Sequence, residues 1–420
     1  MKKKEKKASI LENFISLTFL QVINFLVPLL TIPYLTRVLG VAGYGQVAFI
    51  QITISFFVLF VEFGFPWSAV RDVSRLRDDR HRLSEVSIAI MVVQWALLII
   101  SFACLSIFFY LFTVEEEIKN FLYIGFGMVV GGALFPIWLF SGLELMRQMA
   151  IIQFISKIIL LVPIFIFVKT SDDIDNYLLI LSMGSVLAGV IALYYIYYKK
   201  IIKFILPKNS LVLEQVKSGY LIFPSRIAIS CYTILVPLMV GLISGPGQLA
   251  IYSLADRVRS ASLSIFGVAS QAIFPRINFY ESSNTNSLKK LIKKYTVLSL
   301  FSSVIVGILI YLLSEKIIKI LGGDNFIEAA SVLKYFSALP FFVTVSNILG
   351  IQVMIPKFMN KQFNFILIGA AIFGLIISYP LIRIGGADGG AQVVLIVEGL
   401  IALIMVIYLR VYRIFYSRNL

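Results

Sequence analysis

Histidine and cysteine are nearly absent from this 420-residue sequence, which has one histidine and two cysteines. The single histidine, His81, lies in a charged loop, which argues against a histidine-ligated metal centre or a serine–histidine–aspartate triad. Cys104 and Cys231 lie far apart inside apolar runs, so we predict no disulfide, no metal site and no cofactor. Charge is also scarce, since 14% of the residues are charged, against about 25% in a typical soluble protein.

Hydrophobic residues make up 59% of the chain, and this fraction indicates a protein that crosses a membrane many times. Apolar stretches long enough to span a bilayer recur along the chain, and no connection between them exceeds about 25 residues. We count twelve, at residues 12–36, 44–65, 86–112, 118–140, 149–168, 176–198, 218–243, 248–274, 292–313, 328–355, 361–382 and 390–411. The first follows the basic segment "MKKKEKK" and is too long for a signal peptide, so we expect an uncleaved span.

Lysine and arginine are distributed unequally between the two sides that these spans define. With the N-terminus inside, 26 of the 37 basic residues lie on the inner side, six on the outer side and five within spans. The positive-inside rule then predicts that both termini are cytoplasmic. The net charge of +15 therefore indicates a surface attracted to anionic membrane lipid, with no nucleic-acid partner.

Two short segments repeat each other at a separation of 202 residues. "GYGQVAF" at 43–49 and "GPGQLAI" at 245–251 share Gly-x-Gly-Gln-x-Ala, and each opens the second span of a six-span half. This repeat predicts an all-α polytopic membrane protein with two six-helix lobes, residues 1–205 and 206–420. Because each half has an even number of spans, we expect pseudo-two-fold symmetry about the membrane normal and a central cavity.

The segment "YSLADRVRSASLS" at 252–264 places three charges inside a span. Asp256 and Arg259 are three residues apart on a helix and are predicted to pair. Arg257 has no such partner on its own helix, and it shares a face with polar residues. These are Ser253, Ser260, Ser264 and Gln271. A polar stripe along a membrane helix indicates a side that faces water or protein.

Other spans carry similar polar faces. Arg226 shares a face with Ser230 and Thr233, and the first span carries Gln21 and Asn24. Within the spans, the cations outnumber the acids. The cations are Lys157, Arg226, Arg257, Arg259 and Lys334, and the acids are Glu62, Asp256 and Glu398. Because arginine suits phosphate oxygens, this interior favours an amphiphilic anion such as a lipid-linked sugar phosphate, although small anionic solutes would also fit.

The stretch "PYLTRVLGVAGYGQVAFIQITISFFVLFVEFGFPWSAVRDVSR" at 33–75 resembles the start of bacterial Wzx-type O-antigen flippases. The resemblance lies in "LTRVLG", "YG", "FVEFGF" and "RDVSR", and departs from the family at residues 41–43, where members often have Pro-Glu-Asn. These flippases belong to the multidrug/oligosaccharidyl-lipid/polysaccharide exporter superfamily. The resemblance implies that an undecaprenyl-pyrophosphate-linked oligosaccharide moves from the inner to the outer leaflet of the inner membrane, by alternating access and without enzymatic activity.

No site motif of that family can be transferred to this chain, so the site residues rest on the charge pattern. We expect Arg226 and Arg257 to bind the pyrophosphate, with Arg259 and Lys157 as helpers, and the polar stripes to contact sugar hydroxyls. Asp256 and Glu398 are candidates for coupling to protons or sodium, and Arg37 is a candidate for gating.

Two alternatives remain open. One is a cation-coupled drug antiporter of the same superfamily, which would favour acidic or aromatic cavity residues. The other is a membrane polymerase or glycosyltransferase acting on a lipid-linked sugar, which would need a larger outer loop or an acidic pair facing outward. Other polysaccharide assembly proteins are expected as partners.

Overall fold

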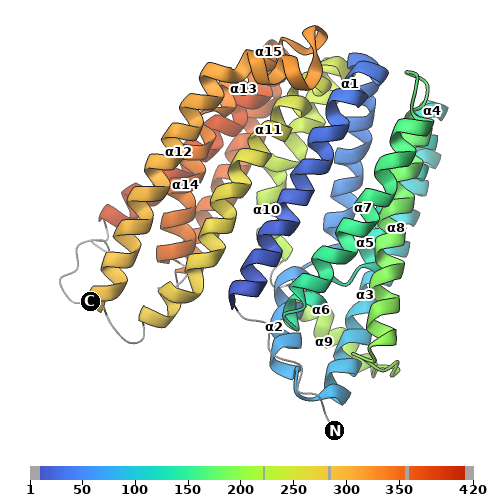
Figure 1. The fold of residues 1–420 in the computed structure, drawn as a ribbon, viewed down its shortest axis with the longest axis vertical. Helices are drawn as coiled ribbons and strands as arrows, with labels where there is room; N and C mark the ends of the chain where they lie inside the picture. Colours follow the sequence, from blue (N-terminus) through green and yellow to red (C-terminus); the bar gives the residue numbers. More distant parts are fainter. Residues whose placement is uncertain (1–9, 221–222, 282–284, 355–358, 412–420) are drawn as a thin grey trace. The chain divides into compact units, whose positions relative to one another are not determined.

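The computed structural model describes residues 10–220, 223–281, 285–354 and 359–411, almost all of them in helices and none in a strand (Figure 1). Within these ranges, some side chains are not described, namely those at 10–26, 29, 225, 228–229, 231, 268–281, 285–292 and 360. The chain forms two compact units. Unit 1 comprises Met1–Leu39 and Ile50–Arg226, and unit 2 comprises Gly40–Phe49 and Ile227–Leu420.

These units differ in detail from the lobes expected from the sequence. Residues 206–226, which the sequence assigned to the C-terminal lobe, pack with unit 1, and residues 40–49 pack with unit 2.

Unit 1 contains a series of helices that follow the apolar stretches. After the long α1 (Ile10–Glu62), they are α2 (Phe65–Leu76), α3 (Arg80–Leu111), α4 (Glu116–Gly125), α5 (Gly127–Leu134), α6 (Ile137–Gly142), α7 (Met146–Phe167), α8 (Ile174–Tyr198), α9 (Asn209–Tyr220) and the start of α10 (Phe223–Thr233). Asp79 caps α3, because its side chain accepts the backbone N–H groups of His81 and Arg82 at 3.1 Å.

Unit 2 contains the remainder of α10 and the helices that follow it. They are α11 (Leu235–Glu281), α12 (Thr285–Gly322), the 3₁₀ turn η1 (Asp324–Phe326), α13 (Ala329–Phe336), α14 (Leu339–Leu349), the π-helical turn η2 (Gly350–Met354) and α15 (Asn360–Val411). Its core lies where α11, α13 and α15 meet, around fully buried side chains such as Leu254, Leu333 and Val397.

Three of the helices are long enough for two crossings, because about 20 residues span a bilayer and these helices have 53, 47 and 52 residues. Each contains one glycine with positive φ, where two helical arms meet: Gly40 (φ 66°) in α1, Gly245 (φ 86°) in α11 and Gly386 (φ 53°) in α15. In α15 the arms fold back on each other, since Gly374 lies against Val397. The described residues form nine helical segments long and apolar enough to span. Three of these segments, Leu30–Leu76, Leu235–Gly267 and Lys361–Val411, each contain one of the turn glycines.

The repeated segments lie at the start of the second arms of α1 and α11, as predicted, but with different registers. Gly245 is both the turn glycine and the first residue of its repeat, whereas Gly40 lies three residues before the repeat at 43–49. Gly45 packs so closely on the Pro246 backbone that a Cβ there would lie 1.9 Å from the Pro246 carbonyl oxygen. The two repeats therefore contact each other inside unit 2.

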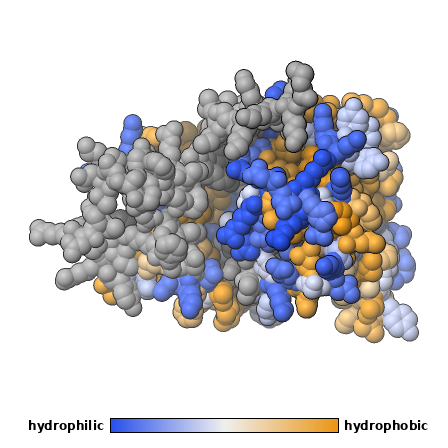
Figure 2. All heavy atoms as spheres, turned by 90° about the horizontal axis from the view of Figure 1, so that it is seen from below, coloured by the Kyte–Doolittle hydropathy of each residue, from blue (hydrophilic) through white to orange (hydrophobic). Residues whose placement is uncertain are grey.

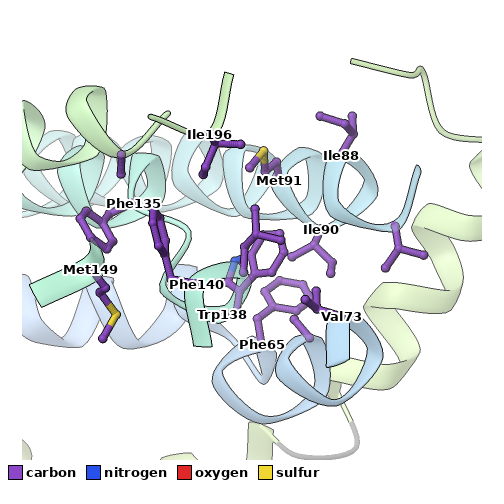
Figure 3. Close-up of a cluster of buried hydrophobic side chains, with 14 of the residues drawn as sticks. Phe65, Val73, Ile88, Ile90, Met91, Phe135, Trp138, Phe140, Met149 and Ile196 are labelled. Atoms are coloured by element: carbon purple, nitrogen blue, oxygen red, sulfur yellow. The ribbon is translucent and has the colours of Figure 1, made fainter. Parts of the chain in front are cut away.

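A large apolar cluster holds the lower helices of unit 1 together (Figure 3). Phe65 of α2, Ile90 of α3 and Trp138 and Phe140 of α6 are 3% exposed or less. The one polar group of Trp138 is satisfied, because its Nε1 donates to Gln94 Oε1 at 2.9 Å. The helix α9 packs on the same cluster through Leu211 and neighbouring apolar side chains.

Candidate functional site

The charged stretch of α11 contains the ion pair that the sequence predicts. Arg259 Nε donates to Asp256 Oδ1 over 2.6 Å, and the Arg259 side chain is 15% exposed. The guanidinium also lies 5.5 Å from the centre of the Phe336 ring of α13. An acid and an aromatic face therefore hold Arg259 in place.

A second acid from a distant part of the chain lies near this pair. Glu398 of α15 is buried, lies within electrostatic range of Arg259, and is within hydrogen-bonding reach of the Tyr232 hydroxyl of α10. Tyr252 of α11 is buried beside Asp256 and Arg259. We call these five residues the Arg259 cluster. In it, Asp256 pairs with the guanidinium, and Glu398 lies within electrostatic range of it.

Arg257, the neighbour of this pair, has different surroundings. Its side chain is exposed, and its guanidinium forms a side-chain hydrogen bond with Tyr44. Tyr44 is buried and packs edge-to-face on Phe326, with ring centroids 5.8 Å apart. The repeat at 43–49 therefore supplies a residue that orients Arg257 within unit 2.

The serines predicted to form a polar stripe are engaged in different ways. Ser260 Oγ lies 3.5 Å from Asp256 Oδ2, and Ser264 Oγ donates to the Ala261 carbonyl at 2.7 Å. The buried Ser253 Oγ has no hydrogen-bond partner within the described ranges. The side chain of Gln271 lies outside the described residues.

Arg226 forms an ion pair that the sequence did not predict. Its Nη2 donates to Glu62 Oε2 and its Nη1 to the Phe63 carbonyl, both over 2.7 Å. The two charged side chains are 20% and 28% exposed, respectively. Arg226 is therefore neutralised and anchored at the end of α1.

The remaining predicted residues are dispersed. Ser230 is half-buried and Thr233 exposed on α10, Lys157 is half-buried on α7, and Arg37 is exposed on α1. The side chains of Gln21 and Asn24 lie outside the described residues. Lys334 of α13 pairs with Glu315 at 2.9 Å.

Sequence reasoning missed Tyr44, Tyr232 and Tyr252 as partners of the charged residues, and gave Glu62 no partner. A single acid in the second span was the available signal for Glu62, since an isolated buried charge requires a partner. No comparable sequence signal distinguished these three tyrosines from the others among the 20 tyrosines of the chain. Among the described residues, no group of three or more His, Cys, Asp or Glu side chains could hold a metal ion.

Comparison with known proteins gives a consistent picture. A family model described as "Polysaccharide biosynthesis protein" matches residues 10–281. A protein of Escherichia coli (strain K12) named "Putative O-antigen transporter" is 31% identical over 96% of this chain and 97% of its own length. One of the same name from Shigella dysenteriae is 27% identical over 94% of this chain and 98% of its own.

Two solved structures share the fold at low sequence identity. The lipid II flippase MurJ in an inward closed conformation has a TM-score of 0.73 and 16% identity, covering 96% of this chain and 88% of its own. An inward-facing multidrug transporter of the MATE family, within the MOP superfamily, has a TM-score of 0.69 and 12% identity, covering 93% and 98%. The all-α, multi-pass architecture expected from the sequence is therefore confirmed.

Proposed function

Since this multi-pass membrane protein belongs to the polysaccharide biosynthesis protein family, we propose that it is a flippase for a lipid-linked oligosaccharide. The cargo is an O-antigen or similar surface-polysaccharide unit on undecaprenyl pyrophosphate. It moves from the cytoplasmic to the outer leaflet of the bacterial inner membrane. The observation that carries this proposal is the near full-length similarity to proteins named as O-antigen transporters.

The charged residues suit the head group of such a cargo. Arg257 presents an exposed guanidinium that Tyr44 orients, and a planar, pre-oriented guanidinium can bind two phosphate oxygens at once. Arg226 contributes if a phosphate displaces Glu62 from it. Arg259 and Lys157 assist in binding the pyrophosphate. The polar side chains of Ser253, Ser230 and Thr233 contact sugar hydroxyls. Arg37 acts in gating.

The Arg259 cluster is our candidate for coupling transport to an ion gradient. When Asp256 and Glu398 are both ionised, the buried group carries one negative charge more than Arg259 balances. A proton or a sodium ion on either carboxylate would remove that excess, and burial makes such an excess costly. Transport proceeds by alternating access, without chemical change to the cargo, in a protein with both termini in the cytoplasm.

Complementation tests this function directly. Wild-type protein should restore surface polysaccharide to a bacterial strain that lacks its own flippase. Arg257→Ala should reduce flipping by about tenfold or more, since a hydrogen bond to a charged group contributes about 1.5–3 kcal/mol, and Arg257→Lys should restore part of it. Lys203→Ala, an exposed cation on the linker before α9, is the control.

Two results would contradict the proposal. Full surface polysaccharide with Arg257→Ala and Arg226→Ala, at normal protein levels, would exclude the arginine site. Export of cationic drugs by wild-type protein without complementation would instead favour a drug antiporter, the alternative that the MATE-like fold leaves open.

A further inference from the structure

A charged basin lies at the lower end of unit 1, and none of the residues that we assign to cargo binding, coupling or gating lines it. Its cavity volume is about 760 Å³, and α2, the first turns of α3, and α9 with the residue before it line it. Figure 2 looks at the molecule from below and shows hydrophilic side chains gathered over this part of the face. The Lys/Arg distribution predicts that this face is cytoplasmic.

Cations outnumber acids among the residues that line the basin. The five cations are Arg71, Arg75, Arg82, Lys208 and Lys217, and the three acids are Asp72, Glu85 and Glu214. Arg71 is engaged, because it contacts Asp72 at 3.0 Å and Ser218 Oγ at 3.2 Å. Within the part of the chain that the structure describes, Arg75, Arg82, Lys208 and Lys217 form no side-chain ion pair. The basin therefore has cationic groups available to bind an anion.

Gln215 gives the basin a second polar feature. This α9 residue lines the basin and is 3% exposed, and its Oε1 has no hydrogen-bond partner among the described residues. A buried acceptor without a partner is destabilising, so it indicates a missing donor. A hydroxyl group of a bound ligand would supply that donor once the Gln215 side chain turns toward the basin, because its Oε1 is withdrawn from the surface of the unliganded protein.

The walls of the basin are built to keep their shape. Leu83 and Val86 of α3 and Leu211 and Val216 of α9 belong to, or pack against, the apolar cluster of Figure 3. The hydrogen bond that Arg71 donates to Ser218 Oγ also links α2 to α9. A preformed site of this kind costs little ordering on binding.

The basin also lies beside a feature typical of a membrane surface. Trp67 of α2 is 67% exposed, and tryptophan is enriched at the boundary between lipid and water. An amphiphile anchored in the inner leaflet could place its head group here while its tail stays in lipid. The basin volume lies within the range of about 300–1,000 Å³ typical of small-molecule sites.

We propose that this basin is a loading site that binds the sugar-diphosphate head group of the lipid-linked cargo before translocation. Arg75 and Arg82 bind phosphate oxygens, and Gln215 Oε1 accepts a hydrogen bond from a hydroxyl of the sugar next to the diphosphate. This inference rests on the proposed function and adds a site distinct from Arg257 and the Arg259 cluster.

Binding to purified full-length protein in phosphatidylcholine nanodiscs tests the assignment. The probes are undecaprenyl diphosphate with one N-acetylglucosamine and undecaprenyl diphosphate alone. The double variant Arg75→Ala/Arg82→Ala should weaken binding of both probes by about tenfold or more. The matched control, Lys199→Ala/Lys203→Ala, removes two exposed cations outside the basin and should leave both affinities unchanged.

Gln215→Met separates the sugar contact from the phosphate contact. It should weaken the sugar-bearing probe by about threefold to tenfold and leave the sugar-free probe within about twofold. Because it removes an unpaired buried acceptor at nearly constant volume, it should also raise the melting temperature of the unliganded protein. A merely structural role for Gln215 would lower that temperature and affect both probes equally.

Three outcomes would overturn the loading site. Equal affinities in the basin double variant and its control would remove the phosphate contact, and equal effects of Gln215→Met on both probes would remove the sugar contact. Full competition by equimolar phosphatidylglycerol would identify a general lipid head-group site. If wild-type protein restores surface polysaccharide but any of these three results is obtained, the proposed function stands and only the loading site is excluded. Failure of complementation contradicts the function itself.

Discussion

Glu62 and Arg226 lie 164 residues apart in sequence and meet over 2.7 Å in unit 1. Both side chains are largely withdrawn from solvent, at 28% and 20% exposed, so each becomes a poorly solvated charge if the other is removed. Breaking a buried pair is generally more destabilising than replacing both partners. The pair therefore stabilises the fold mainly because each side chain neutralises a charge that would otherwise be poorly solvated and unpaired.

We expect Glu62→Ala and Arg226→Ala to be strongly coupled. A double-mutant cycle measured by denaturant-induced unfolding should give a coupling energy of about 1–3 kcal/mol. The surface pair Lys119–Glu116, at 2.6 Å and with Glu116 83% exposed, is the control and should give about 0.5 kcal/mol or less. Additive effects at Glu62 and Arg226 would mean that the pair contributes nothing to the fold.

At the scale of elements, the turns depend on glycine for two different reasons. Gly245 has φ of 86° with open space where a Cβ would lie, so only its backbone conformation favours glycine. Gly45 has helical geometry, but a Cβ there would overlap the Pro246 carbonyl. One position is limited by conformation, and the other by close approach.

This difference predicts unequal effects of alanine. Gly245→Ala should cost about 1–3 kcal/mol, because φ of 86° with ψ of 172° is a conformation that residues with a Cβ hardly adopt, whereas Gly45→Ala should cost more because two backbones must move apart. Gly369→Ala, in helix α15 with open space around it, should be neutral or stabilising. Thermal unfolding of the purified variants gives the ranking, and equal losses at Gly45 and Gly245 would refute the close-packing argument.

The connection between α7 and α8 is organised by one acid outside the spans. Asp173 Oδ2 accepts the backbone N–H groups of Lys169 at 2.9 Å and Thr170 at 2.8 Å, as well as the Thr170 hydroxyl. The Lys169 N–H, then the two Thr170 groups, lower the pKa of Asp173 to about 2. The ionised carboxylate therefore stabilises this loop.

Because the folded-state pKa is below the ordinary value of 3.8, the stabilisation is complete above that pH and is lost as the pH falls through about 2. Hydrogen exchange of the Lys169 and Thr170 amides, corrected for intrinsic rates, should show protection at pH 6 that disappears near pH 2. In Asp173→Asn, protection at pH 6 should already be reduced and should vary little with acidification. A wild-type loss of protection centred near pH 4 would contradict the lowered pKa.

Local sequence patterns predicted the helices and one contact within a helix. They did not predict contacts between helices that are distant in sequence. Hydropathy located the apolar helices, and the i,i+3 spacing located the Asp256–Arg259 pair, since both are properties of a single helix. The pairing of Arg226 with Glu62 and the approach of Glu398 to Arg259 join distant helices, so no local pattern predicts them. No sequence pattern distinguished Gly40 as the turn glycine of α1, since it lies three residues before the repeat at 43–49.

At the scale of the whole molecule, the coupling that we propose requires that ion binding change the arrangement of helices. The Arg259 cluster joins helices α10, α11 and α15 of unit 2, so a change in its charge acts on three helices at once. Coulomb interactions are strong where water is excluded, and a buried group with two carboxylates and one guanidinium changes its internal balance with each proton or cation bound. Such a group can link ion binding to helix rearrangement.

Glu398→Gln tests this link because the amide keeps the shape of the side chain and carries no charge. Arg259 would remain paired with Asp256, so the variant should fold and should still flip its cargo down a concentration gradient. In proteoliposomes with an imposed proton or sodium gradient, wild-type flipping should accelerate several-fold and Glu398→Gln should lose that acceleration. Glu328→Gln, an acid of unit 2 just before α13 and outside the cluster, should respond as wild type does. If Glu398→Gln keeps the full response to both gradients while Glu328→Gln loses it, the coupling site lies elsewhere, and the Arg259 cluster only holds three helices together.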